Sequence, residues 1–436
     1  MLLSISIFAV CYIFIASEKV EKSIVALLGA AAVICLHQVP YEEALGKVDL
    51  NVIFLLLGMM IIVNILSDTG LFEWVAVTLA HKSGGNGLLV VIFLLGVTAL
   101  FSAFLDNVTT VILIAPITIL LMQILELPAA PILILEAIFS NIGGTATLVG
   151  DPPNILIGSQ TQLDFNDFLI HLGPVVVVIF LLLIGLVGWL LRNRLCADKK
   201  ARQRVMKAEP RRAITDPVAL RKALPVFGLV LGGFFFGRVL DIEPGIVALA
   251  GALLMALICK TDVSHAVSRV EWNTILFFIG LFMMVAALEY NGVFEQLGGS
   301  LLALTGDHLL ATVLILLWAS ALMSAIVDNI PLVIAMIPLV HSIVPAFAVS
   351  TGLEGSPELV QAQIRAPLFW ALALGACLGG NGSLIGASAN VVIAQVAKRN
   401  KYELSFMQFM RWGFPVMLVS LVVSSIYLYL RYFVFS

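Results

Sequence analysis

Twelve apolar segments follow one another along the chain, and their lengths constrain its fold more than any other feature. A helix needs roughly 20 apolar residues to cross the hydrocarbon of a bilayer. Hydrophobic residues make up 61% of the chain and charged residues 12%, against roughly 25% charged residues in soluble domains. A water-soluble fold could not bury this much apolar surface, so the sequence predicts an all-α polytopic membrane protein.

Ten segments predict crossings, and two more predict re-entrant helical hairpins. The crossings are 2–17, 23–38, 52–67, 131–160, 168–191, 223–240, 244–260, 272–288, 366–397 and 410–434. Gly, Pro and polar residues interrupt 131–160 and 366–397. The segments 87–125 and 308–346 each carry an Asp-Asn pair near the middle, which favours a hairpin over one ordinary span or two spans with a buried turn. The first segment lacks the basic start of a signal peptide, so we interpret it as a retained span.

A basic linker predicts the orientation. Residues 192–222 hold eleven Lys or Arg and three acidic residues, and loops rich in Lys and Arg stay in the cytoplasm. Five crossings on each side of this linker then place both termini outside an inner cell membrane.

The two halves of the sequence repeat. A constant shift of 222 positions pairs 23–27 with 245–249, 47–51 with 269–273, 70–73 with 292–295 and 102–107 with 324–329, and a shift of 236 then pairs 143–154 with 379–390. Each copy crosses the membrane an odd number of times, so the second is expected to lie inverted relative to the first. We therefore divide the chain into inverted repeats of five transmembrane helices at 1–191 and 223–436, joined by the linker. Such repeats are typical of secondary transporters, which bind solute near the midplane between the repeats.

Four polar breaks interrupt the apolar segments, at 104–110, 141–154, 324–331 and 379–390. Gly and Pro at this density unwind a helix, and unwound backbone at membrane depth needs a protein-lined or wet pocket. The ends of broken helices can hold ions and oxygen-rich solutes there. The candidate binding residues are Asp106, Asn107, Thr109, Thr110, Asn141, Gly143, Gly144, Thr145, Thr147, Asp151 and Asn154 in the first repeat, and Ser324, Asp328, Asn329, Gly380, Asn381, Ser383 and Asn390 in the second.

Asp106 and Asp328 occupy equivalent hairpin tips. A carboxylate at membrane depth is expensive and usually functional, so each is predicted to carry a proton or, with Asn107 and Asn329, to bind Na⁺. The alternative is that each only caps the half-helix that follows. Asp151 precedes a Pro-Pro pair and either caps the next half-helix or takes part in coupling.

Other ionisable residues carry weaker signals. Glu136 either carries a proton or has a structural partner near the membrane edge, and Glu73 and Glu295 are expected at interfaces. His341 is not expected to be a ligand. Lys and Arg are nearly absent from the breaks, which favours a neutral oxygen-rich solute over a multiply charged organic anion.

Several function classes lack their motifs. The chain has no phosphate-binding loop, no nucleophile constellation, no structural metal spacing and no basic stripe for nucleic acid. The five cysteines are interpreted as packing residues, and the alternative for Cys377, beside the fourth break, is a thiol that contacts the solute. We therefore expect a transporter and not an enzyme, with no cofactor, with H⁺ or Na⁺ as coupling ion, and with the lipid bilayer and a small inorganic solute as partners. Energy comes from an ion gradient or from a separate ATPase subunit on the basic linker.

The motifs Phe104-Leu-Asp-Asn-Val-Thr-Thr110, Asn141-Ile-Gly-Gly-Thr-Ala-Thr147 and Gly150-Asp-Pro-Pro-Asn154 resemble those of the ArsB/NhaD branch of the ion-transporter superfamily. Within it, the chain is most similar to arsenical-pump permeases and the melanosomal P protein. The related sodium–dicarboxylate symporters carry Ser-Asn-Thr at the tips, where this chain has Asp-Asn-Val and Asp-Asn-Ile.

The resemblance implies a homodimer whose transport domain holds both hairpins and both broken helices and moves like an elevator. It implies export of arsenite or antimonite against inward proton movement. A Na⁺/H⁺ antiporter and a Na⁺-coupled anion transporter are the alternatives, and a non-transporting membrane scaffold is the alternative of another class.

Overall fold

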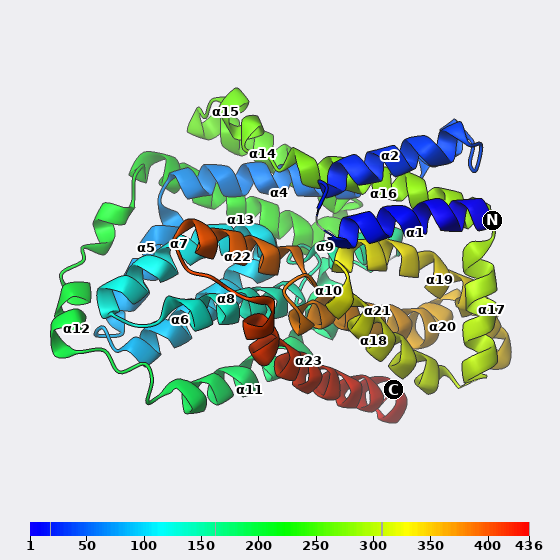
Figure 1. The fold of residues 1–436 in the computed structure, drawn as a ribbon. Coiled ribbons are helices and arrows are strands. Elements are labelled where there is room, and N and C mark those ends of the chain that lie inside the picture. Colours follow the sequence, from blue (N-terminus) through cyan, green and yellow to red (C-terminus); the bar gives the residue numbers. More distant parts are fainter. Residues whose placement is uncertain (18, 162, 307, 436) are drawn as a thin grey trace.

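The structure, a computed structural model, describes residues 1–17, 19–161, 163–306 and 308–435. Every regular element in this part of the chain is a helix, and ten helical stretches in it are long and apolar enough to cross a membrane. They include both arms of each expected hairpin, whereas four helices within expected crossings are shorter: Leu2–Ile15, Lys22–Cys35, Ala129–Gly144 and Pro244–Cys259. The predicted fold class is therefore confirmed. Figure 1 shows the helices running mostly side by side along one direction.

The first half of the chain consists of eleven helices in the described residues. They are α1 (Leu2–Ser17), α2 (Lys22–Cys35), α3 (Tyr41–Gly46), α4 (Leu50–Asp68), α5 (Leu71–Lys82), α6 (Gly87–Phe104), α7 (Asn107–Leu125), α8 (Ala129–Gly144), α9 (Pro152–Gln160), α10 (Phe165–His171) and α11 (Gly173–Leu191). The basic linker adds α12 (Lys199–Met206) and the short η1 (Pro210–Ala213).

The second half follows the same order. Its elements are α13 (Pro217–Leu240), α14 (Pro244–Cys259), α15 (Val263–Ser268), α16 (Trp272–Tyr290), α17 (Val293–Thr305), α18 (Leu309–Ile326), α19 (Asn329–Ser350), α20 (Pro357–Val360), η2 (Gln361–Arg365), α21 (Ala366–Gly379), η3 (Gly380–Gly382), α22 (Ser388–Arg399), α23 (Phe406–Tyr429) and η4 (Leu430–Val434). The segment expected as a crossing from 223 begins earlier, at Pro217, because Asp216 caps α13 by accepting from Val218 N and Ala219 N.

The expected hairpins are α6–α7 and α18–α19. An aspartate begins the second arm of each: Asp106 accepts from the backbone N–H of Thr109 at 2.8 Å, and Asp328 accepts from that of Ile330 at 3.3 Å. Capping of the following helix is thus confirmed at both tips. Figure 1 shows α6 and α7 towards one end of the molecule and α18 and α19 towards the other, with α12 beside the first pair and α17 beside the second.

Helices α5 and α17 were not expected as separate elements. Each begins after a glycine in the left-handed region, Gly70 with φ 77° and Gly292 with φ 70°, which turns the chain sharply away from the preceding crossing. These glycines are the repeat-related starts of the paired 70–73 and 292–295 segments.

Close helix contacts occur twice, at equivalent positions. A Cβ on Gly58 would lie 2.4 Å from the carbonyl carbon of Ala248, and one on Gly280 would lie 2.6 Å from that of Ala26. Both glycines and both alanines are 222 positions apart. The pairs α4–α14 and α16–α2 therefore pack backbone to backbone in the same way in each half.

Candidate functional site

The side chain of Asn141, near the end of α8, joins three segments. Its Nδ2 donates to Asn381 Oδ1 at 2.9 Å and to Asn390 Oδ1 at 3.0 Å, while its Oδ1 accepts from Asn107 Nδ2 at 3.1 Å. All four side chains are buried. The first hairpin tip and both broken helices therefore meet in one buried amide cluster.

Two asparagines hold the unwound segments in place. Asn154 Nδ2 donates to the carbonyl of Thr147 at 2.9 Å, and Asn390 Nδ2 donates to the carbonyl of Ser383 at 2.9 Å. These bonds are equivalent under the shift of 236. They satisfy carbonyl groups that the breaks in α8–α9 and α21–α22 leave without helical partners.

The two tip carboxylates have different surroundings. Asp106 accepts from the hydroxyl of Thr109, on its own hairpin. Asp328 accepts from Lys22 Nζ at 3.1 Å, at the start of α2, and from Ser388 Oγ at 3.0 Å, at the start of α22. The position equivalent to Lys22 in the second half is Pro244, so Asp106 has no cation in the equivalent place. Within the described residues, the ion pairs include one at the second tip and none at the first.

Asp151 stands before α9 and is completely buried. Its Oδ1 accepts from Asn329 Nδ2 at 3.5 Å, and its Oδ2 has no partner among the described residues. The interpretation that Asp151 caps the next half-helix is wrong, because its side chain makes no capping hydrogen bond to α9. The carboxyl instead lies within electrostatic range of both Asp106 and Asp328.

Some predicted site residues use their polar atoms to fix the backbone. Thr145 donates to the carbonyl of Asn141 at 2.7 Å and Ser324 to that of Ala376 at 2.6 Å, while Thr147 donates to that of Ala103. A Cβ on Gly143 would lie 2.0 Å from the carbonyl oxygen of Ala99, and similar backbone contacts surround Gly144 and Gly380.

Other predicted residues keep polar atoms without partners. Buried atoms with no hydrogen bond among the described residues are Asn107 Oδ1, Thr110 Oγ1, Asp151 Oδ2, Asn381 Nδ2 and Ser383 Oγ. Unpartnered buried polar atoms are costly. Hydrogen bonds from a bound solute to these atoms would therefore be especially favourable.

Sequence reasoning missed three side chains at this centre. Lys22 and Ser388 contact Asp328, and the thiol of Cys377 donates to Asn154 Oδ1 at 3.5 Å. The packing interpretation of Cys377 omitted this bond. A signal existed for Cys377, because the shift of 236 pairs it with Asn141, and each of the two donates to the break asparagine of the other repeat.

Glu271 adds an ionisable group just before α16. The equivalent Asp49 caps α4 by accepting from Asn51 N at 3.0 Å, whereas Glu271 makes no capping bond. Burial first, and the charge of Asp106 second, raise the pKa of Glu271 to about 7. This residue therefore titrates close to neutral pH beside the first tip.

One cavity borders the second tip, and a larger one lies further along α9 and α19. The first, of about 250 Å³, is lined by Glu21, Lys22, Asp328 and Ser388 among others. The other, of about 440 Å³, lies between α16–α17 and α19–α9.

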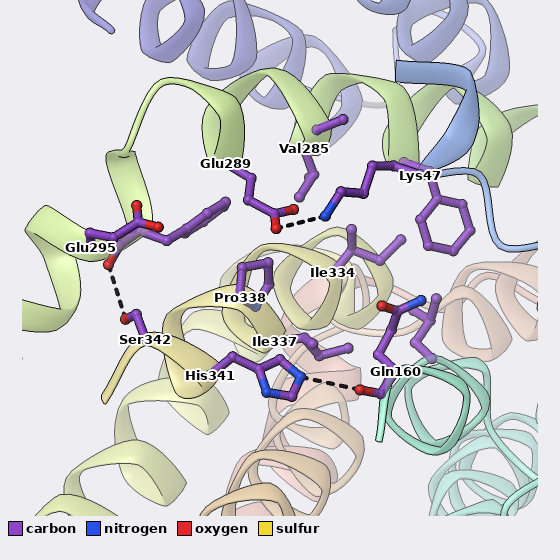
Figure 2. Close-up of a pocket in the computed structure, with 14 residues that line it drawn as sticks. Lys47, Gln160, Val285, Glu289, Glu295, Ile334, Ile337, Pro338, His341 and Ser342 are labelled. Atoms are coloured by element: carbon purple, nitrogen blue, oxygen red, sulfur yellow. Dashed lines mark hydrogen bonds and ion pairs between the residues drawn. The ribbon is translucent and has the colours of Figure 1, made fainter. Parts of the chain in front are cut away.

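Figure 2 shows Lys47 and Glu289 pointing towards each other in the larger cavity, joined at 2.7 Å, and His341 bonded to the carbonyl of Gln160 at 3.2 Å. Glu295 also lines this cavity.

Comparisons with known proteins agree with a transporter. A sequence model described as "CitMHS: Citrate transporter" matches residues 12–360. The "46 kDa membrane protein" of Mycobacterium leprae is 44% identical over 438 residues, covering 100% of this chain and 99% of the relative. An "Uncharacterized transporter" of Mycobacterium tuberculosis is 45% identical over 440 residues, covering 100% of both.

A more distant relative and a solved structure extend the comparison. The human P protein is 34% identical over 505 residues, covering 97% of this chain and 59% of the relative, so the predicted likeness to the P protein is confirmed. The crystal structure of the YdaH transporter of Alcanivorax borkumensis, reported with an unusual topology, matches with a TM-score of 0.58 at 15% identity and covers 92% of this chain and 89% of that one. The placement in the ArsB/NhaD branch stays a prediction. The chain belongs to the CitMHS citrate transporter family of multi-pass membrane transporters.

Proposed function

We propose that this transporter exports a small, uncharged, oxygen-rich solute, with arsenite or antimonite as the first case, in exchange for protons. The observation that carries the proposal is the buried centre itself, where Asn107, Asp151, Asn381 and Ser383 present unpartnered polar atoms. A solute with several hydroxyl groups can donate to the oxygens and accept from the amide nitrogen. It would then satisfy polar atoms that have no partner among the described residues.

The charge of the centre supports a neutral solute. The carboxyl group of Asp151 lies within electrostatic range of those of Asp106 and Asp328. Lys22 is the cation at this place in the described chain and is already paired with Asp328. An anionic solute would meet uncompensated negative charge, whereas the trihydroxy form of arsenite carries none.

The same carboxyl groups support coupling to a cation. Asp106 and Asp151 have no basic partner among the described residues, so each gains from a proton or Na⁺. We assign the coupling proton to these two groups and a positioning role to Asp328, whose charge Lys22 compensates. Na⁺/H⁺ antiport, with Asn107 and Asn329 completing the ligands, is the alternative.

Citrate transport is a second candidate, favoured by the family description. The carboxyl-rich centre opposes it, because a free tricarboxylate would have to displace Lys22 from Asp328 or remain unpaired. For motion and assembly, we propose an elevator-like movement of the hairpins and broken helices against α2, α4, α14 and α16, in a homodimer in the cell membrane. The basic linker would face the cytoplasm and both termini the outside.

Proteoliposomes with an imposed proton gradient test these assignments. Arsenite accumulation that follows the gradient, and that Asp106→Asn and Asp151→Asn each reduce at least tenfold, supports the proposal. Asp241→Asn is the matched control, because Asp241 is exposed between α13 and α14. Accumulation of citrate but not arsenite supports the second candidate. Collapse of the gradient by Na⁺ alone supports antiport, and no flux of any of the three overturns all of these readings.

A further inference from the structure

Glu136 is a buried carboxyl group that the proposed transport cycle does not use. It lies within α8, and its side chain is 1% exposed. Neither Oε1 nor Oε2 has a hydrogen-bond partner among the described residues. The expected structural partner near the membrane edge is therefore not seen. Burying an ionised carboxylate without partners costs far more than burying the neutral acid, so this position is suited to a carboxyl group that holds a proton.

The helices around Glu136 offer no counter-charge. Helices α6, α7 and α11 pack against α8 and contain no charged residue. The other helices that pack closely against α8 are α21, η3, α22 and α23, and their titratable residues are Cys377, Lys398, Arg399, Arg411, Tyr427 and Tyr429. The three basic side chains among these are exposed. A proton, and not a basic side chain, is therefore what neutralises Glu136.

A discontinuous row of hydroxyl and amide groups on α7 runs from Glu136 towards the centre: Thr118 and Thr110 are about 12 Å apart along the helix, and the buried apolar Val111 and Ile114 lie between them. Asn107, Thr110 and Thr118 lie at i, i+3 and i+11 on one face of α7, and each has a buried side-chain oxygen without a partner. Thr118 lies beside the Glu136 carboxyl. Asn107 bonds to Asn141, one and a half turns after Glu136 on α8. These polar groups interrupt an otherwise apolar interface between α7 and α8.

We propose that Glu136 is a second proton-binding site, which exchanges its proton with the first hairpin tip along this row. When the proton leaves, the O–H bond of the carboxyl breaks and the Thr118 hydroxyl accepts the proton as it gives up its own. A chain of several water molecules that enter between α7 and α8 then has to carry the proton over the roughly 12 Å from Thr118 to Thr110. A new O–H bond then forms on the Asp106 carboxylate. This inference rests on the proposed function and extends it, because it identifies Glu136 as the group that binds the coupling proton while solute occupies the centre.

Infrared difference spectroscopy tests the proton site without any solute. The purified protein in lipid should show the C=O stretching band of a protonated carboxyl group at neutral pH. This band should disappear in Glu136→Gln and shift in Thr118→Val, which changes the neighbour and keeps the acid. Ser424→Ala is the matched control, since Ser424 on α23 is also buried with an unpartnered oxygen but lies outside the row.

Transport assays then separate coupling from binding. In Glu136→Gln, solute exchange at equal pH on both sides should stay within threefold of wild type, while accumulation driven by a proton gradient should fall at least tenfold. An unchanged band together with unchanged accumulation in Glu136→Gln overturns the inference. If no solute is transported by the wild-type protein, the proposed function fails, and the infrared band still decides whether Glu136 holds a proton. If Glu136→Gln does not fold, Glu136→Asp replaces it: because this variant keeps a carboxyl group, the band should shift in frequency and not disappear.

Discussion

The side-chain nitrogen of Asn141 donates to the side-chain oxygen of Asn390 at 3.0 Å across 249 residues of sequence. The bond joins the end of α8 to the start of α22, so it ties the broken helix of one repeat to that of the other. Cys377 and Asn154 make the equivalent connection in the reverse sense. Contacts between the repeats therefore join the two halves of the centre, in addition to the bonds that each half makes within itself.

Replacing Asn141 by Ala should disable the centre. The change removes two donated hydrogen bonds and one accepted bond and leaves the buried partners Asn107, Asn381 and Asn390 short of them, a loss of about 1–3 kcal/mol per unsatisfied group. We expect a clear fall in melting temperature in detergent and at least a tenfold loss of transport. Asn166→Ala is the control, because Asn166 makes one exposed bond to the carbonyl of Phe235 and should leave both quantities unchanged.

The ion pair between Lys22 and Asp328 should contribute measurable stability. The Lys22 and Asp328 side chains are 33% and 14% exposed, so the pair is partly buried. Exposed ion pairs contribute less than about 1 kcal/mol to stability, and disrupting a buried pair costs about 3–5 kcal/mol. We expect a value between these two. Lys22→Met should destabilise the protein by about 1–2 kcal/mol.

The double variant Lys22→Met/Asp328→Asn should then be more stable than the sum of the single changes predicts. Denaturant unfolding in detergent measures all three variants. Strict additivity of the two changes would contradict the pairing, and Lys207→Met, in the exposed linker, serves as the control for loss of a positive charge.

Glycine substitutions should separate close helix contacts from open ones. In Gly58→Ala and Gly280→Ala the new Cβ meets backbone at 2.4 Å and 2.6 Å, and backbone cannot move aside without separating the helices. We expect each change to cost about 1–3 kcal/mol. Gly228→Ala on α13 has nothing within 4 Å and should be neutral or slightly stabilising, because alanine favours helix. Equal melting temperatures for all three variants would argue against the packing described here.

Glu271 should make stability depend on pH. Its folded-state pKa of about 7 lies above the ordinary value of 4.5, so the folded chain holds this proton more tightly than the unfolded chain does. The contribution to stability is full below pH 4.5 and is lost as the pH rises towards and through 7.

The melting temperature in detergent should therefore fall over this window, and Glu271→Gln should flatten that part of the profile. Glu354→Gln, at an exposed position, should leave the profile unchanged. If the melting temperature of Glu271→Gln falls with pH as steeply as that of the wild-type protein, Glu271 is not the source of this pH dependence.

Much of the fold could be predicted because apolar length and repeated polar motifs are local properties. The crossings at 52–67 and 272–288 correspond to α4 and α16, and the two Asp-Asn pairs mark the beginnings of α7 and α19. The short helices α5 and α17 were missed. Their start depends on a glycine at positive φ, and a lone glycine within an apolar pattern is a weak signal.

The centre was predicted less completely, because side-chain partners depend on packing between distant segments. Residue types and spacing indicated Asn141, Asn154 and Asn390, but not that Asn141 would bond across the repeats. Lys22 was missed for the same reason: it is 306 positions from Asp328 and begins an apolar segment, where a charge usually marks only the membrane boundary. The capping interpretation of Asp151 was wrong because its carboxyl turns towards Asn329.

The lysine at one tip has a consequence for the energetics of alternating access. A carrier built from two equivalent repeats would have two end states of equal free energy, and it would rest on either side of the membrane with equal probability. Lys22 holds the second tip through a charge that Pro244 cannot offer to the first. In a transporter that alternates between such end states, this difference gives the carrier a preferred resting side. The free-energy change is then uphill in one half-cycle and downhill in the other.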